Sequence, residues 1–181
     1  MKNLKEKLTQ WRLKKIQKKQ LSKSNFIDYR KELTEARKVL FLIPDEKTEY
    51  TEFNDFLTRL KKLFPALKTY YLMVENHPAG IIERGALIFS YNKNDSNFLD
   101  LYKKEFISKL KKESFDMIFD LNKDFHTNTS YILLSLDVPL KITFYDDSPI
   151  GCSSLCVKPE GEDTEQKRFD VLLKYLSILS S

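Results

Sequence analysis

The sequence predicts an α/β protein: a single Rossmann-like domain with a doubly wound, mainly parallel sheet of about five to six strands, preceded by an extra basic helix. Three observations predict this class. Short apolar runs alternate with amphipathic helical patterns, which is typical of βαβ units. The 181 residues are enough for one domain with a full core. Only 4 Gly and 6 Pro argue against disorder and against a loop-rich β-sandwich.

The chain begins with two segments that precede the predicted Rossmann-like domain. Residues 1–24 predict a basic amphipathic helix because they contain no Gly or Pro and many helix formers. Residues 25–37 indicate a polar connector with some helical character. The apolar run 38–43, stopped by Pro44, predicts the first buried strand and opens the domain 38–181.

A helix and two strands follow in the first half of the domain. Apolar residues recur at spacings of three and four before Pro65, which predicts a helix: Tyr50, Phe53, Leu57, Leu60 and Phe64. Residues 68–74 and 86–91 predict the second and third strands, with a turn at 76–80 between them.

The second half continues the alternation. A polar loop at 92–97 precedes a helical pattern formed by Leu99, Tyr102, Phe106 and Leu110. Residues 115–121, 140–145 and 155–158 predict three further strands, the last one short, and a helix at 127–136 separates the first two. The last helix carries its apolar residues on one face: Phe169, Leu172, Leu173, Leu176 and Leu179.

The positive charge of the chain is concentrated at its start. Residues 1–24 carry a net charge of +8 within a total of +5, so the rest carries −3. Leu4, Leu8 and Trp11 are spaced to share one helical face. Three interpretations stay open: these residues rest with Ile16 on the domain or on a second copy, or the helix binds RNA phosphates, or it lies on an anionic membrane surface. In the RNA and membrane interpretations, the contact is made by Trp11 and the bases around it: Arg12, Lys14, Lys15, Lys18 and Lys19.

The cysteines and the hydropathy pattern indicate the compartment. Cys152 and Cys156 would share a face of a strand but stand too far apart to form a disulfide. We expect two reduced thiols, as in cytoplasmic proteins. No apolar run approaches the roughly 20 residues that cross a bilayer, and the start lacks the pattern of a signal peptide. The sequence therefore predicts a cytoplasmic protein.

Candidate site residues follow the strands, because ligands of open α/β sheets bind at the carboxyl ends of the strands. The predicted pocket comprises Asp45, Glu49, Glu75, His77, Asp120, Asn122 and His126. The turn after the first strand has no glycine and the chain has no Walker motif, so we expect no nucleotide cofactor. With two histidines in the chain, we also expect no metal site. Asp120 and His126 could together do acid–base work, or they could satisfy loop amides and begin a helix; we assign no catalytic residue.

The order of elements carries a family resemblance. The helix closing on Leu63-Phe64-Pro65 and the strand Phe115-Asp116-Met117-Ile118-Phe119-Asp120-Leu121 resemble the N-terminal half of family 9 glycosyltransferases, the heptosyltransferases of lipopolysaccharide synthesis. The resemblance covers roughly residues 38–145. The chain is also similar to small stand-alone bacterial proteins, chiefly from Bacteroidota, with this half-fold.

The resemblance implies parts that this sequence lacks. Enzymes of the family hold the nucleotide-sugar donor in a second Rossmann-like domain, and the sequence ends before such a domain could begin. The family also places a Gly-Asp pair after its first strand, with the Asp proposed as catalytic base. Here that stretch is Pro44-Asp45-Glu46-Lys47-Thr48-Glu49-Tyr50, with no such pair. A complete glycosyltransferase is therefore disfavoured.

Three functional hypotheses result. The first is a non-catalytic binding or scaffold module whose basic helix contacts a protein partner, an anionic surface or a second copy. Exposed sheet edges left by the missing domain favour self-association or a protein partner. The second hypothesis is a degenerate or partner-completed glycosyltransferase-like protein that binds sugars. The third is an RNA- or ribosome-associated protein.

Overall fold

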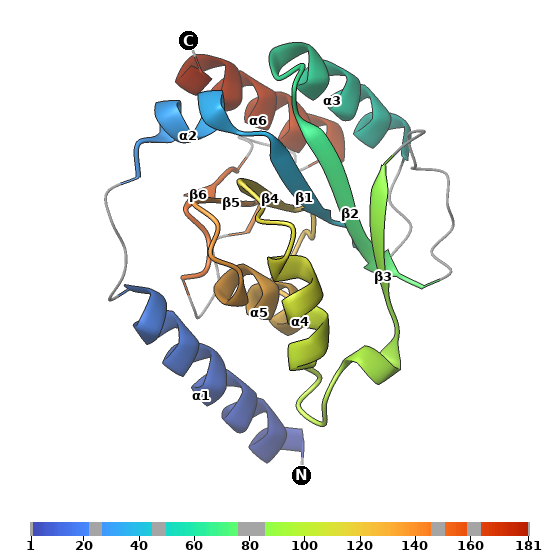
Figure 1. The fold of residues 1–181 in the computed structure, drawn as a ribbon, viewed down its shortest axis with the longest axis vertical. Coiled ribbons are helices and arrows are strands. Elements are labelled where there is room, and N and C mark those ends of the chain that lie inside the picture. Colours follow the sequence, from blue (N-terminus) through green and yellow to red (C-terminus); the bar gives the residue numbers. More distant parts are fainter. Residues whose placement is uncertain are drawn as a thin grey trace.

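Within the described part of the chain, six strands form one fully parallel sheet in the order β3-β2-β1-β4-β5-β6 (Figure 1). The computed structural model describes residues 2–21, 27–44, 50–75, 86–145, 151–158 and 164–180. The strands are β1 (Lys38–Leu42), β2 (Lys68–Val74), β3 (Leu87–Tyr91), β4 (Met117–Asp120), β5 (Leu140–Thr143) and β6 (Leu155–Cys156). The predicted Rossmann-like, doubly wound sheet is confirmed. The strand order changes direction between β1 and β4, so the topological switch point lies between these two strands.

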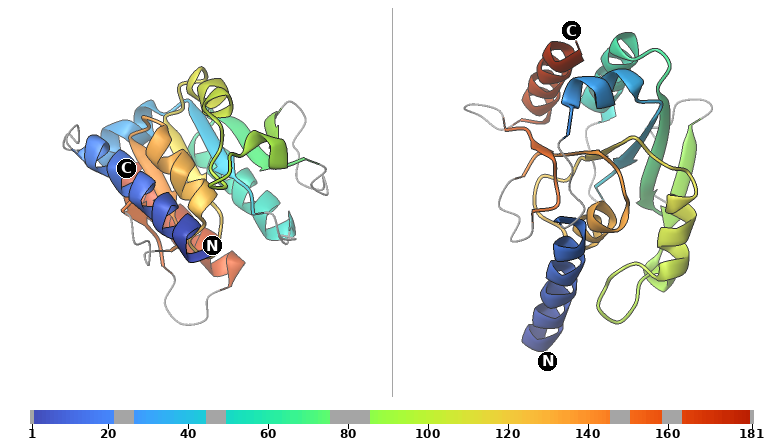
Figure 2. Two further views of the ribbon diagram at one scale, coloured as in Figure 1. Left: turned by 90° about the horizontal axis from the view of Figure 1, so that it is seen from below. Right: turned by 60° about the vertical axis from the view of Figure 1, so that its left-hand side comes forward.

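Helices cover both faces of the sheet (Figures 1 and 2). They are α1 (Lys2–Leu21), α2 (Tyr29–Glu35), α3 (Tyr50–Leu63), α4 (Lys104–Lys111), α5 (Thr127–Ser135) and α6 (Glu165–Ser180), with a 3₁₀ turn η1 (Lys93–Asp95). α3 and α6 lie on one face with α2 beside α6. α4 and α5 lie on the other face, and α1 packs beside α5 on that same side of the sheet. None of the helices in the described ranges is both long enough and apolar enough to cross a membrane.

The face under α3 and α6 is built around aromatic rings. Phe41 of β1 is fully buried and stacks on Tyr71 and Phe119 of the neighbouring strands, with centroids 5.6 and 5.3 Å away. Phe56 of α3 stacks on Phe169 of α6 at 4.6 Å. These strands are buried on both sides, which explains their nearly continuous apolar sequence.

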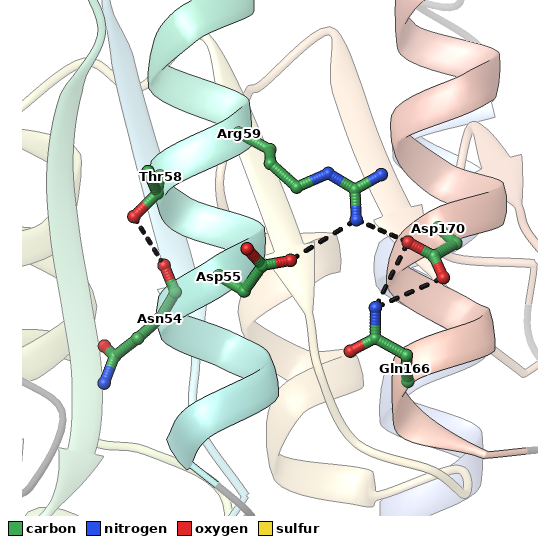
Figure 3. A network of polar contacts seen from close by, with 6 residues as sticks. All are labelled: Asn54, Asp55, Thr58, Arg59, Gln166 and Asp170. Carbon is green, nitrogen blue, oxygen red and sulfur yellow. Dashed lines mark hydrogen bonds and ion pairs between the residues drawn. The ribbon is translucent and has the colours of Figure 1, made fainter.

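An ion-pair network joins α3 to α6 at the surface (Figure 3). The Arg59 guanidinium donates to Asp170 at 2.5 Å and to Asp55 at 3.4 Å. Gln166 donates to the same Asp170 carboxylate at 3.2 Å. The hydrogen bond from Arg59 holds the pKa of Asp170 below its ordinary value. The network adds polar contacts to the ring packing of Phe56 and Phe169 between the two helices.

The fourth helix begins later than its apolar spacing predicts. Leu99 and Tyr102 are buried as expected, but α4 starts only at Lys104. The Asn97 side chain accepts the Leu99 backbone N–H at 2.8 Å, and Asp100 takes a left-handed backbone with φ of 57°. An Asn side chain that bonds nearby backbone competes with helix formation. Leu99 and Tyr102 therefore lie in a loop, although they are buried and spaced as they would be in a helix.

The remaining elements lie where the sequence predicts them, with shorter strands. The connector contains α2, whose N-cap Asp28 accepts the Lys31 N–H at 3.1 Å. The strands β4, β5 and β6 are two or three residues shorter than their apolar runs. Cys152 and Cys156 form no disulfide with each other, and only Cys156 lies in β6.

Candidate functional site

A cavity of about 610 Å³ opens at the carboxyl edge of the sheet, above the switch point. Ile43 follows β1, Asn122 follows β4 and Phe144 follows β5, and all three line it. The first turns of α5 and α6 complete the wall with Asn128 and Arg168. The place of the cavity follows from topology, because adjacent crossovers run in opposite directions at this point.

The structure brings some of the predicted pocket residues together. Asn122 and His126 line the cavity, and Asp120 lies buried next to Asn122. Glu75 lies elsewhere: it is exposed and accepts the Asn92 side-chain amide at 2.8 Å. Asp45, Glu49 and His77 fall outside the described residues.

Asp120 organises the floor beneath the cavity. Its Oδ1 accepts the backbone N–H of Asn122 at 3.1 Å and the side-chain amide of Asn122 at 2.6 Å. Its Oδ2 accepts the Tyr145 hydroxyl at 2.6 Å. Burial raises the pKa of Asp120 above its ordinary value, and these hydrogen bonds offset part of that effect. Burial and the adjacent carboxylate raise the pKa of Tyr145 as well, so its hydroxyl stays protonated and donates.

The Asp120–Tyr145 pair therefore serves as a structural clamp between β4 and the segment after β5. Asp120 has no exposed surface, and among the described residues no hydrogen bond joins it to His126. His126 is exposed and occupies the N-cap of α5. The two residues therefore lack the geometry of an acid–base pair.

Two cavity residues contributed by helices, Arg168 and Asn128, were missed by the sequence analysis. Arg168 is buried on α6, and its guanidinium lies 5.9 Å from the Phe144 ring centroid. Asn128 has a buried Oδ1 that finds no hydrogen-bond partner within the described ranges. The lining also includes four charged residues: Asp100, Lys123, Asp124 and Glu165. A search confined to strand ends could find Tyr145 but not side chains contributed by the helices.

A second candidate surface is the outer face of α1. Leu4, Leu8 and Trp11 are 64%, 43% and 62% exposed. The Lys15 ammonium lies 5.4 Å from the centroid of the Trp11 ring. The expectation that Leu4, Leu8 and Trp11 rest on the domain is therefore wrong for the single chain.

A different side of α1 holds the helix in place. Leu13 is fully buried in the core under α4 and α5, and Ile16 packs against that core. Thr9 is buried and Gln20 donates to the Leu136 carbonyl at 3.4 Å. Apolar residues thus lie on two opposite sides of the helix, so α1 has no single apolar face. This arrangement leaves Leu4, Leu8 and Trp11 pointing outward.

The exposed bases lie around that outward stripe. Lys14, Lys15, Lys18 and Lys19 are exposed, and Arg12 is half-buried. Lys5 instead forms an ion pair with Asp100 at 2.5 Å, which ties the start of α1 to the loop before α4. That loop carries Phe98, which is 77% exposed. The outer face of α1 therefore combines bare apolar side chains with positive charge.

Comparisons with known proteins show the fold. No family model matches this chain, and neither does any curated protein. It is similar to Escherichia coli heptosyltransferase WaaC with ADP, at 11% identity and a TM-score of 0.51, over 76% of this chain and 46% of that one. It is also similar to a family 9 glycosyl transferase from Veillonella parvula, at 13% identity and a TM-score of 0.52, over 82% of this chain and 43% of that one.

The structural comparisons confirm the resemblance to a family 9 glycosyltransferase half at the level of fold. The chain spans less than half the length of each of these two proteins. At this level of identity, the activity of the similar proteins does not transfer with the fold.

Proposed function

We propose that this protein is a non-catalytic binding module that attaches to an anionic lipid surface through the outer face of α1. One observation carries the proposal: the exposed stripe of Leu4, Leu8 and Trp11 lies on the side of the helix away from buried Leu13. A side chain that only stabilised the domain would be covered by it. Exposed apolar residues in a contiguous patch mark interaction surfaces.

The combination of side chains favours lipid over RNA. Lysines attract either phosphate-rich surface. RNA phosphates, however, would leave Leu4 and Leu8 in water, whereas a headgroup layer buries them. Burying a Leu or Trp contributes about 1.5–3 kcal/mol, and each base near an anionic leaflet contributes about 1 kcal/mol. Three apolar groups and several bases are together sufficient for reversible attachment.

The apolar contribution is tested by co-sedimentation with vesicles of phosphatidylcholine, with and without phosphatidylserine. We expect binding that requires phosphatidylserine and that drops on Leu8→Ser or Trp11→Ser. Leu63→Ser is the matched control, because Leu63 on α3 is 39% exposed, close to the 43% of Leu8. Equal loss in Leu8→Ser and Leu63→Ser would contradict a role for α1.

The charge contribution is tested by reversing two exposed lysines. Lys14→Glu with Lys18→Glu should abolish vesicle binding. The control is Lys109→Glu with Lys112→Glu, two exposed lysines in α4 and at its C-cap, which should preserve binding. Binding to RNA that falls steeply with salt and survives Trp11→Ser would replace the lipid proposal with the RNA alternative. Point variants are preferable to deletion of α1, because deletion would also remove Leu13 from the core.

A second candidate function is binding of a sugar or nucleotide sugar in the cavity at the strand ends. The unsatisfied Asn128 Oδ1 favours it, because that acceptor calls for a hydroxyl or amine donor. A melting-temperature screen against ADP, nucleotide sugars and lipid sugars tests it. The rise in melting temperature caused by the ligand should vanish in Asn128→Ala. It should persist in Asn54→Ala, a matched change at an exposed position of α3. If no compound raises the melting temperature, this candidate is eliminated.

A further inference from the structure

One edge of the sheet is open within the described structure. β3 is the outermost strand and pairs with β2 in parallel register from Tyr70↔Leu87 to Val74↔Tyr91. No described strand or helix pairs with its other edge (Figure 1). Among the described residues, the main-chain groups on that edge have no strand partner, which is the arrangement that strand addition requires.

The direction of those groups follows from one hydrogen bond. The Glu75 N–H donates to the Tyr91 carbonyl at 2.7 Å, so the main-chain groups of Tyr91 point toward β2. Successive residues of a strand present their N–H and C=O groups to opposite edges. Ile88 and Ser90 therefore point theirs away from β2, and no described residue pairs with them.

The side chains of this edge lack the usual protection. Residues 86–91 contain no charged residue and no proline, although charged residues make up 31% of the chain. Leu87 is 54% exposed and Ile88 is 41% exposed, and they lie on opposite faces of the sheet. Proteins normally block open edges with lysine, proline or a bulge. An unprotected apolar edge is suited to pairing with another strand.

We propose that β3 pairs antiparallel with β3 of a second copy, joining two six-stranded sheets across a two-fold axis at Phe89. In this register, Ile88 of one copy faces Ser90 of the other, and the two residues exchange both main-chain hydrogen bonds. These are the residues whose groups point outward. On one face, Leu87 comes to lie opposite Tyr91, an aliphatic–aromatic pair that favours antiparallel strands.

The second copy fits this edge because the edge is complementary to itself. The outward main-chain groups of Ile88 and Ser90 all find hydrogen-bond partners in this one register. The contact uses the open β3 edge of both copies, so association stops at the dimer. A charged edge would select a partner of opposite charge, but residues 86–91 contain no charged side chain. This association uses a different part of the molecule from the outer face of α1, so either proposal can fail without the other.

Sedimentation equilibrium of the full chain over a range of concentrations tests the dimer. Ser90→Pro removes an outward N–H without touching the β2 pairing, and Leu87→Lys places a charge on the edge. Each should raise the dimer dissociation constant about tenfold or more. Ile178→Lys, at a site 59% exposed on α6, is the matched control and should leave it unchanged. A protein monomeric at every concentration, or a dimer insensitive to both β3 variants, overturns the proposal.

Cysteine cross-linking tests the register independently. In a Cys156→Ser background, Phe89→Cys places two thiols opposite each other at the two-fold axis, in a pair whose Cα atoms approach to about 4.5 Å. Ser90→Cys lies opposite Ile88 and serves as the control. Oxidation should convert Phe89→Cys to a covalent dimer and leave Ser90→Cys monomeric, with circular dichroism confirming that both fold. Cross-linking at position 90 but not at 89 refutes the proposed register. Absence of cross-linking at both positions refutes pairing with a second copy, because a strand from another protein would carry neither cysteine.

Discussion

Replacing Lys141 by Met should stabilise the protein at neutral pH. Lys141 lies on β5 with only 8% of its surface exposed, and its ammonium group donates to the Gln20 side chain of α1 at 3.3 Å. Burial lowers the pKa of Lys141 from 10.5 to about 8, although the nearby Asp137 carboxylate opposes this. At neutral pH the folded state therefore contains a buried Lys141 ammonium charge that lowers its stability.

The size and sign of the effect follow from the difference in pKa between the folded and unfolded chains. Below pH 8 both states carry the proton, and the folded state is penalised by about 3 kcal/mol. The penalty falls as the pH rises and is about 1 kcal/mol at pH 10. Losing the hydrogen bond to Gln20 costs about 1 kcal/mol at either pH. Lys141→Met should thus gain about 2 kcal/mol at pH 7 and almost nothing at pH 10.

Urea unfolding followed by circular dichroism at both pH values measures the difference. Lys109→Met on α4 is the control, because exposed positions change stability by about 0.5 kcal/mol or less. If the gain from Lys141→Met is the same at pH 7 and pH 10, or if the variant is destabilised at pH 7, the buried charge is not the cause and the reasoning fails.

Three further predictions concern the clamp, the docked helix and the ion-pair network. Tyr145→Phe should lower the free energy of unfolding by about 1–3 kcal/mol in urea titrations, since buried Asp120 loses a donor; no loss would show that the clamp is dispensable. Leu13→Ala should cost about 2–5 kcal/mol while Leu8→Ala costs little, because only the first leaves a cavity; equal costs would contradict the assigned faces of α1. The pKa of Asp170 lies below its unfolded value, so its stabilisation is present above the unfolded pKa and is lost as the pH falls through the folded one. Asp170→Asn should therefore flatten the acid side of the stability curve, and an unchanged acid side would count against the network.

The sequence allowed the fold to be predicted because the strands of a parallel sheet are buried on both faces. Runs such as 38–43 and 68–74 are apolar at nearly every position, and this pattern does not depend on distant residues. The helix expected from Leu99 onward failed for a local reason, because the Asn97 side chain binds the backbone that a helix would need. Apolar spacing alone does not distinguish these outcomes.

The orientation of α1 could not be predicted from periodicity. The helix offers two apolar sides, one with Leu8 and Trp11 and one with Leu13 and Ile16. Which side docks depends on the shape of the α4 and α5 surface, which local sequence does not encode. For the cavity, the rule that ligands bind at strand ends located Asn122 and Asp120. It gave no information about burial, and it is the complete burial of Asp120 that makes this residue structural.

The position of Trp11 also determines what spectroscopy can measure in this protein. It is the chain's single tryptophan, and it stands on the outer surface of α1 rather than among the rings around Phe41. Its emission therefore monitors the surroundings of one helix, and a shift to shorter wavelength would signal that this helix has entered an apolar medium. Loss of the interior would instead appear in the near-ultraviolet dichroism of buried rings such as Tyr71. The protein thus carries separate optical reporters for docking and for unfolding.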